Sequence, residues 1–206
     1  VMKHLIFDFD GVLGDTNQAR IEVIKEIDFL SEEEILTESR QYWMQSTHMR
    51  SANLSAETIK KNLDWSRKFG EAMVKKDFPL FDDFLKEIAG IEDTRLAVVS
   101  SGSEIYIKPN LENSGLKFTH ILTFEDDPSK EEKVERICRD WGVPTKDAYF
   151  FTDTVSDVRE LENLIDNDKM YGCSWGYQGR ENLSIALDNE HILNNFEDIR
   201  GIFGED

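Results

Sequence analysis

The segment Leu5-Ile6-Phe7-Asp8-Phe9-Asp10-Gly11 decides the fold of this chain. Its apolar residues are typical of a strand that is buried on both faces of a parallel sheet. Because side chains alternate along a strand, Asp8 and Asp10 lie on the same side of its carboxyl end. An unpaired buried carboxylate is costly, so this pair needs a nearby cation or contact with solvent. The alternative is a strand that runs out into an acidic turn.

Six apolar segments have the length of a strand, and longer amphipathic segments lie between them. The strand segments are His4–Phe9, Arg95–Ser100, His120–Phe124, Ala148–Thr152, Lys169–Cys173 and His191–Leu193. The helical segments are Phe81–Ala89, Ser129–Trp141, Val155–Ile165 and Arg180–Leu187. This alternation predicts an α/β fold with a doubly wound parallel sheet. In such a sheet, the chemistry is concentrated beyond the carboxyl ends of the strands.

One segment, residues 16–76, interrupts the alternation because it contains no strand candidate. We therefore expect a small helical domain that is inserted into the α/β core. The predicted helical cap covers residues 15–78, and the predicted core covers residues 1–14 and 79–206. Gly14 and Phe78–Pro79 mark the two joints.

Two serines predict where helices of the inserted segment begin. Ser31 and Glu34 form the pattern of a capping box, which opens a helix that runs through Trp43. Ser55 is placed to cap a further helix. One side of that helix is expected to carry Ile59, Leu63, Phe69 and Met73.

The composition excludes several classes of function. The chain has 206 residues with 42 Asp and Glu against 24 Lys and Arg, which gives a formal net charge of −18. A chain this acidic has no general basic surface for nucleic acid or for an anionic membrane. No apolar run approaches the ~18 residues of a membrane span, and Val1–Leu5 does not resemble a signal peptide. We expect a cytoplasmic protein that binds neither nucleic acid nor membrane; its oligomeric state is not indicated.

The cysteine content indicates the redox state of the chain. Cys138 and Cys173 are too few for a disulfide framework. Both are expected to be reduced thiols, as in intracellular proteins.

Hydroxyl groups and a glycine follow the second predicted strand, in Leu96-Ala97-Val98-Val99-Ser100-Ser101-Gly102-Ser103. Hydroxyls and free main-chain N–H groups at such a place suit an anionic oxygen. Ser100, Ser101 and Gly102 are therefore candidates for phosphate binding. The alternative is that Ser101 or Ser103 only caps the helix that follows.

A second pair of acids follows the fourth predicted strand, in Phe150-Phe151-Thr152-Asp153-Thr154-Val155-Ser156-Asp157. Asp153 comes directly after the strand, and Asp157 lies four residues on, on the same face of the next helix. The alternative is that these acids only stabilise the amino end of that helix.

The combination of these segments indicates more than any one of them. Asp8, Asp10, Asp153 and Asp157 would converge at one edge of the sheet and repel one another unless a divalent cation joins them. Mg²⁺ suits a site made of oxygen ligands. Lys130 begins a predicted helix and adds a positive charge. Acids, hydroxyl, lysine and metal together indicate phosphoryl transfer through an aspartyl phosphate.

In these segments the chain resembles the haloacid dehalogenase superfamily. Its first motif stands here as Asp8-Phe9-Asp10-Gly11-Val12-Leu13-Gly14-Asp15-Thr16, and its second as Leu96–Ser100. The third motif is a lysine, best matched by Lys130, with Lys133 as the other candidate. The fourth stands as Thr152–Asp157. Two details depart from the pattern: Thr152 replaces the usual glycine, and the common Lys-Pro of the third motif is missing.

The resemblance narrows to members with a helical cap between the first and second motifs, similar to phosphoglycolate phosphatases and beta-phosphoglucomutase. The loop 172–181 also resembles the loop after the fifth strand in phosphoglycolate-phosphatase-like members. The alternative is that Trp175 and Tyr177 in this loop only pack. The presence of Asp10 disfavours dehalogenation, because the dehalogenases lack this second acid.

The resemblance implies a role for each catalytic candidate. Asp8 would attack phosphorus, and Asp10 would protonate the leaving oxygen and then activate water. Ser100 and Lys130 would hold the non-bridging oxygens, within a phosphate site that includes Ser101 and Gly102.

It also implies a Mg²⁺ site. The metal would be held by Asp8, by the main-chain carbonyl of Asp10 and by Asp153. Asp157 would bind the metal directly or through water.

We therefore expect a Mg²⁺-dependent phosphatase that hydrolyses a small phosphorylated metabolite. Three alternatives stay open: a phosphomutase of the beta-phosphoglucomutase type, a phospho-acceptor signalling module, and a catalytically silent binding protein. The identity of the substrate cannot be read from the sequence. The candidates for its recognition in the cap are Arg20, Lys25, Arg40, Trp43, His48 and Arg50.

Overall fold

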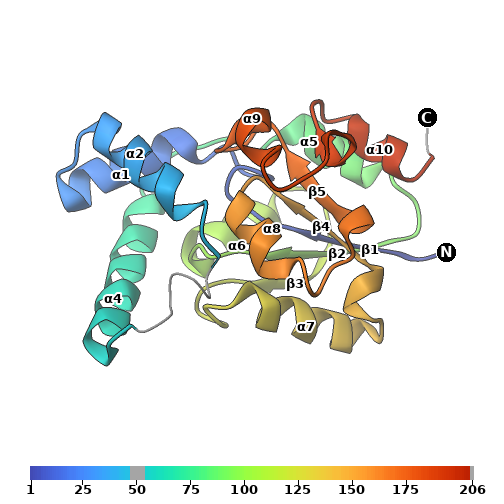
Figure 1. The fold of residues 1–206 in the computed structure, drawn as a ribbon, viewed down its shortest axis with the longest axis horizontal. Helices are drawn as coiled ribbons and strands as arrows, with labels where there is room; N and C mark the ends of the chain where they lie inside the picture. Colours follow the sequence, from blue (N-terminus) through green and yellow to red (C-terminus); the bar gives the residue numbers. More distant parts are fainter. Residues whose placement is uncertain (47–53, 205–206) are drawn as a thin grey trace.

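A sheet of six parallel strands forms the centre of the computed structural model, which describes residues 1–46 and 54–204 (Figure 1). The strands lie in the order β3-β2-β1-β4-β5-β6. Their bounds are Lys3–Phe7 (β1), Thr94–Val99 (β2), Phe118–Leu122 (β3), Ala148–Thr152 (β4), Met170–Cys173 (β5) and Ile192–Leu193 (β6). Each predicted strand segment overlaps one of these strands, and the predicted doubly wound α/β fold is confirmed.

The register of the central strands brings their carboxyl ends together. Phe7, the last residue of β1, is level with Val98 of β2 and with Phe151 of β4. Because these strands run in the same direction, the residues that follow them emerge at one edge of the sheet. Asp8 and Asp153 are thereby placed at neighbouring strand ends.

The described residues contain nine α-helices. Their bounds are Asn17–Asp28 (α1), Glu32–Tyr42 (α2), Ala56–Met73 (α4), Asp82–Ala89 (α5), Glu104–Glu112 (α6), Lys130–Trp141 (α7), Val155–Leu161 (α8), Gly179–Leu183 (α9) and Asp198–Ile202 (α10). Three single 3-10 turns are Thr145–Asp147, Asn167–Lys169 and Asn189–His191. The four predicted core helices are present as α5, α7, α8 and α9, although α8 and α9 end earlier than predicted.

Of the other two core helices, α6 was expected only as a helix of unstated length after the second strand, and α10 was not predicted. The helix α6 contains Pro109, a residue that removes an N–H donor and argues against a helix interior. The helix α10 has only five residues, too few for a helical period to be recognised.

Side chains alternate across β1, so that Leu5 and Phe7 face one layer of the core and Ile6 faces the other. The first layer packs under α5, α6 and α10, and the second packs under α7, α8 and α9. All three side chains are fully buried. The sheet is therefore covered on both faces, as the apolar sequence of its strands predicts.

The inserted segment forms α1, α2 and α4, which lie together at one end of the molecule, away from the chain termini (Figure 1). The described part of residues 16–76 contains no strand. The capping box of Ser31 and Glu34 is present, and Ser55 caps α4. The residues of the predicted apolar side of α4 are buried to different extents, because Ile59 and Leu63 in its first half are 48% and 43% exposed, whereas Met73 at its end is fully buried. This half lies at the end of α4 that is farthest from α1 and α2 (Figure 1).

The two connections between insertion and core run side by side. Asp15 N–H donates to the carbonyl of Pro79 at 2.9 Å, and Phe81 N–H donates to that of Leu13 at 2.8 Å. Gly14 and Leu80 form an isolated antiparallel bridge between these donors. Both predicted joints therefore lie at one place in the fold.

Neither cysteine is in a disulfide, and both Cys138 and Cys173 are buried. Among residues 1–46 and 54–204, no helix is long and apolar enough to cross a membrane.

Candidate active site

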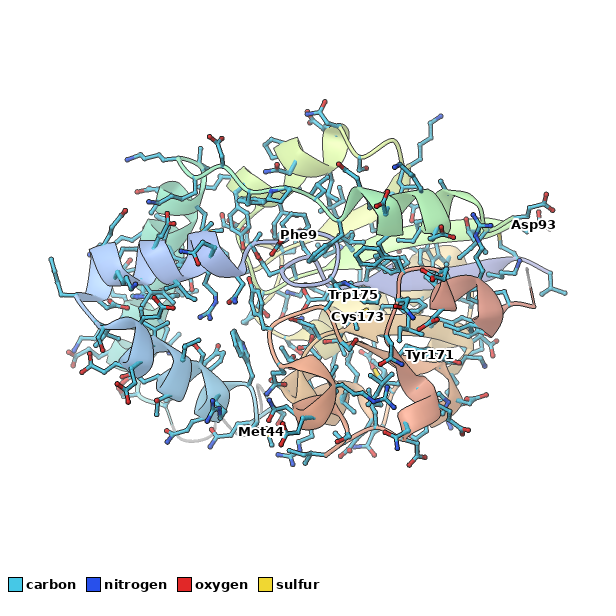
Figure 2. All side chains as sticks on the ribbon, turned by 90° about the horizontal axis from the view of Figure 1, so that it is seen from above. Phe9, Met44, Asp93, Tyr171, Cys173 and Trp175 are labelled. Atoms are coloured by element: carbon cyan, nitrogen blue, oxygen red, sulfur yellow. The ribbon has the colours of Figure 1, made fainter. Side chains whose placement is uncertain are left out.

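The candidate site lies at the carboxyl edge of the sheet, where the insertion meets the core. Seen from above, Phe9, Cys173 and Trp175 mark this central region (Figure 2). Asp8 directly follows β1, and its main-chain N–H continues the ladder by donating to the carbonyl of Phe151 at 2.9 Å. Its Oδ1 accepts from the N–H of Phe9 at 2.7 Å, so the carboxylate is fixed in orientation.

Lys130 begins α7 and lies buried between two carboxylates. Its Nζ donates to Asp8 Oδ2 at 2.8 Å and to Asp157 Oδ2 at 2.7 Å. Glu160 Oε1 accepts from the main-chain N–H of Lys130 at 2.8 Å and so holds the start of the helix. Burial alone would lower the pKa of Lys130, but Asp157 and Asp8 outweigh burial and raise it. The ammonium is therefore charged.

Lys133, the other candidate, has a different environment one turn later. Its Nζ donates to the main-chain carbonyls of Ser100 at 2.6 Å and Thr123 at 3.3 Å. Burial, together with the nearby charge of Lys130, lowers the pKa of Lys133 to about 8. Lys133 thus joins the ends of β2 and β3, whereas Lys130 contacts the acids.

Asp10 lies in the turn after β1 and is held by two hydroxyl groups. Thr16 Oγ1 donates to Asp10 Oδ1 at 2.8 Å, and Tyr106 Oη donates to Asp10 Oδ2 at 2.8 Å. Desolvation raises the pKa of Asp10, and the two hydrogen bonds oppose this rise. Sequence reasoning missed Tyr106, because it lies on α6, whose extent was not predicted.

Asp153 follows β4 and has one satisfied and one unsatisfied oxygen. Its Oδ2 accepts from the N–H of Tyr177 at 2.7 Å, whereas its buried Oδ1 has no hydrogen-bond partner among the described residues. A Cβ on Gly11 would lie 2.1 Å from Oδ2, and Gly11 has a φ of +75°, so a glycine is needed there. Burial is the main cause that raises the pKa of Asp153 to about 7.

The threonine that replaces the usual glycine of the fourth motif contributes a donor. Thr152 Oγ1 donates to Asp157 Oδ2 at 2.7 Å and accepts from the N–H of Thr154 at 3.1 Å. Burial would raise the pKa of Asp157, but Lys130 and this hydroxyl outweigh burial and lower it. Asp157 is thus held as an anion beside Lys130.

The predicted phosphate loop follows β2. Ser100 is 1% exposed, and its Oγ accepts from the N–H of Gly102 at 2.9 Å. Ser101 is exposed. A Cβ on Gly102 would lie 2.1 Å from Tyr106 Oη and 2.9 Å from Asp10 Oδ2, so Gly102 makes room for the contact between these two residues. The N-cap of α6 is Ser103.

The insertion also places Arg20 beside the site. The guanidinium of Arg20 lies 4.6 Å from the ring centroid of Trp43 and 5.0 Å from that of Tyr177. Tyr177 belongs to the loop after β5 and also touches Thr16 through its hydroxyl. In contrast, Trp175 packs against core rings, with Phe84 and Phe196 among them, so the alternative of simple packing holds for Trp175 only.

The other cap candidates lie elsewhere. Lys25 pairs with Glu32 at the surface, and Arg40 is exposed. His48 and Arg50 fall outside the described residues.

The donors at the site fit a small hard cation. In the described part of the chain, no group of three or more His, Cys, Asp or Glu residues is arranged to hold a metal, and Asp157 is engaged by Lys130 and Thr152. The unpartnered Oδ1 of Asp153 is the observation that fits a metal. Two carboxylates, Asp8 and Asp153, with a main-chain carbonyl and water suffice for Mg²⁺, which keeps several waters and takes few carboxylates.

The comparisons with known proteins agree with this fold. Residues 5–162 match the family described as haloacid dehalogenase-like hydrolase. No curated protein matches the chain.

Many solved structures share the fold. A predicted phosphatase from Clostridium acetobutylicum has 18% identity and a TM-score of 0.74, and the match covers 100% of this chain and 99% of that one. A predicted phosphoglycolate phosphatase from Haemophilus somnus has 18% identity and a TM-score of 0.68, covering 98% of each chain. A mutant of CbbY from Rhodobacter sphaeroides, in complex with xylulose-(1,5)bisphosphate, has 18% identity and a TM-score of 0.65, covering 100% of each chain. At this identity the likeness shows the fold.

Proposed function

Because the chain belongs to the haloacid dehalogenase-like hydrolase family, we propose that it is a phosphatase that acts through an aspartyl phosphate on Asp8. Its substrate is a small phosphorylated metabolite. The observation that carries this proposal is the buried triad in which Lys130 joins Asp8 to Asp157. A carboxylate oriented by a permanent cation, with a second acid two residues later, suits nucleophilic attack on phosphorus.

In the first step, a carboxylate oxygen of Asp8 forms a bond to phosphorus, and the ester P–O bond breaks. Asp10 gives its proton to the leaving oxygen. In the second step, Asp10 takes a proton from water, which attacks phosphorus and releases Asp8 and phosphate. A general acid and base needs a pKa near the working pH. The raised pKa of Asp10, whose main cause is desolvation, moves this carboxyl in that direction.

Charge on the transferred phosphoryl group needs donors that are already in place. Lys130 supplies an ammonium that needs no reorganisation, because Asp8 and Asp157 hold it. The hydroxyl oxygen of Ser100 accepts from Gly102, so its own hydrogen is available to donate to a phosphate oxygen. Lys133 acts indirectly, since it holds the carbonyl of Ser100.

A bound Mg²⁺ would neutralise charge on the phosphoryl oxygens. We propose that it is held by Asp8, by the main-chain carbonyl of Asp10 and by Asp153. Asp157 is assigned the separate task of orienting Lys130.

We also propose that the insertion, residues 15–78, is a cap domain that closes over the site. The segment after α2 touches α8 of the core: Arg159 Nη1 donates to the carbonyl of Met44, and Ser156 Oγ donates to that of Gln45 at 2.6 Å. Met44 lies where the two parts meet (Figure 2). Closure excludes water from the reacting groups and completes the site.

The decisive experiment measures phosphate release from p-nitrophenyl phosphate with Mg²⁺ and with EDTA. The wild type should turn over only with the metal, and Asp8→Asn should abolish turnover. The melting temperature of Asp8→Asn without metal should hold or rise, because one of several mutually repelling carboxylates is removed. Activity above a few per cent in Asp8→Asn would exclude Asp8 as the nucleophile.

A further inference from the structure

Arg20 is a buried cation whose hydrogen-bond partners are neutral. It is 8% exposed. Its Nη1 donates to Ser39 Oγ at 2.8 Å, and its Nη2 donates to Asn17 Oδ1 at 3.2 Å. No carboxylate within the described residues forms an ion pair with it. A guanidinium remains charged in proteins, and a buried charge is costly unless a partner of opposite sign is present.

Two aromatic rings, which also pack against each other with centroids 4.9 Å apart, contact the guanidinium of Arg20. The rings of Trp43 and Tyr177 lie 4.6 Å and 5.0 Å from its central carbon. Its Nε has no hydrogen-bond partner among the described residues, and the guanidinium has more N–H donors than Ser39 and Asn17 use. In-plane N–H donors match the oxygens of a carboxylate or a phosphate.

A chain of contacts connects Arg20 with Asp10, the residue that would protonate the leaving group. Tyr177, which lies beside it, touches Thr16, and Thr16 donates to Asp10. Tyr177 also donates its main-chain N–H to Asp153. Arg20 is therefore connected through Tyr177 and Thr16 to Asp10, the proposed acid for the leaving oxygen.

We infer that Arg20 is a second anion-binding site, which binds a carboxylate or a second phosphate on the leaving group of the substrate. The inference rests on the proposed phosphatase function. The substrate is then a small phosphate ester with a second anionic group a few bonds from the ester oxygen. Binding of that group supplies the charged partner that the buried guanidinium lacks. In a chain with a net charge of −18, such a local cation is needed to hold a doubly anionic substrate.

The test uses three esters of similar length: propyl phosphate, phosphooxypropanoate and propanediol bisphosphate. The readout is the ratio of kcat/KM for each anionic ester to kcat/KM for propyl phosphate. In Arg20→Gln this ratio should fall about 10- to 100-fold, as for the loss of a hydrogen bond to a charged group. The ester with the larger fall identifies the second group as carboxylate or phosphate.

Two further variants control the test. Lys25→Gln, which removes a surface cation from the same helix, should leave the ratio unchanged. Arg20→Lys should recover only part of it, because an ammonium lacks the planar fork. If the ratio of kcat/KM values changes less than about twofold in Arg20→Gln, the inference is overturned. Partial unfolding of the variant cannot cause such a change, because both kcat/KM values are lowered by the same folded fraction.

A binding measurement separates this inference from the proposed function. Calorimetry on Asp8→Asn should show that phosphooxypropanoate or the bisphosphate binds more tightly than propyl phosphate, and that the preference is lost in Asp8→Asn with Arg20→Gln. If the wild type hydrolyses no ester, including p-nitrophenyl phosphate, the phosphatase proposal fails, and calorimetry alone decides on the anion site. Equal binding of the three esters would refute the anion site.

Discussion

The α/β core and the helical insertion bury their apolar residues to different extents. Leu5, Ile6 and Phe7 of β1 are fully buried. In the insertion, Leu36 is 43% exposed and Ile59 is 48% exposed. The core is therefore held by burial of apolar surface on both faces of the sheet. The insertion depends more on signals within its own helices, such as the capping box at Ser31.

The two regions also treat buried charge differently. In the core, Lys130 has two carboxylate partners at hydrogen-bond distance. In the insertion, the guanidinium of Arg20 donates to two neutral side chains, Ser39 and Asn17. The ammonium of Lys130 is thus paired with carboxylates of the core. The guanidinium of Arg20 forms no ion pair with a carboxylate of the described residues. This difference is consistent with the proposals that the core carries the chemistry and that the insertion recognises the substrate.

The largest effect on activity should come from substitution of Asp10, because this carboxyl group transfers a proton in both proposed steps. Asp10→Asn keeps the shape and the acceptor for Tyr106 or Thr16 but removes proton transfer, which contributes about 10²–10⁴-fold. With p-nitrophenyl phosphate, whose leaving group needs little protonation, the aspartyl phosphate should form and then persist. Acid quench and mass spectrometry should find the phosphoryl group on Asp8. A long-lived phospho-enzyme already in the wild type, transferred to a sugar phosphate faster than to water, would instead indicate a mutase.

A comparison of the two core lysines is expected to give the next largest effect. Lys130→Met should lower kcat by about 10²–10³-fold, because it removes a fixed charge from the phosphoryl site. Lys133→Met should lower kcat less than about 10-fold but should destabilise the fold by about 1–3 kcal/mol, since the carbonyls of Ser100 and Thr123 lose a buried donor. Steady-state kinetics and denaturant unfolding measure both. Equal kcat losses would contradict the assignment of Lys130.

Metal binding should stabilise the core through Asp153. Mg²⁺ at about 100 times its Kd should add about 2.7 kcal/mol to the free energy of unfolding. The melting temperature should rise by roughly 2–4 °C for each kcal/mol. Asp153→Ala should abolish this rise together with activity. The matched change Glu33→Ala in the insertion, an exposed acid, should leave the rise intact. A melting curve and a rate that EDTA does not change would refute the metal site.

The smallest effect is expected from removal of a helix cap, which tests whether the insertion and the core differ in stability. Ser31 in the insertion and Ser129 in the core each accept a hydrogen bond from the third residue of their helix, both at 3.3 Å. Replacement of either serine by alanine should cost about 1 kcal/mol. For Ser31→Ala, hydrogen exchange should rise only in α2, with kcat within about twofold of the wild type.

Ser129→Ala should instead lower the unfolding midpoint of the core and also kcat, because Lys130 follows it directly. If both variants lowered the midpoint equally, the insertion and the core would unfold as one unit.

Local patterns were sufficient to predict much of this molecule. Each strand of the sheet was predicted, because strands buried on both faces consist of short continuous apolar runs. The positions of Asp8 and Asp153 directly after strands followed from the same runs. The helix starts at Ser31 and Ser55 were predicted because a cap involves residues only three positions apart.

Contacts between distant residues decided the rest. Lys130 and Asp8 are separated by 122 positions, and only the parallel register of β1 and β4 and the packing of α7 and α8 bring them together. Tyr106 meets Asp10 across 96 positions from a helix that contains a proline. The roles of Thr152 and Arg20 likewise depend on which atoms surround them.

The sequence by itself determined the strands, most of the helices and the acids at the strand ends, because these depend on interactions between neighbours along the chain. Only the tertiary structure decided that Lys130 contacts the acids while Lys133 contacts carbonyls, and that Arg20 packs beside the rings of Trp43 and Tyr177. The physical reason is that burial and charge pairing depend on distance in space, and folding brings together residues that are far apart in the chain.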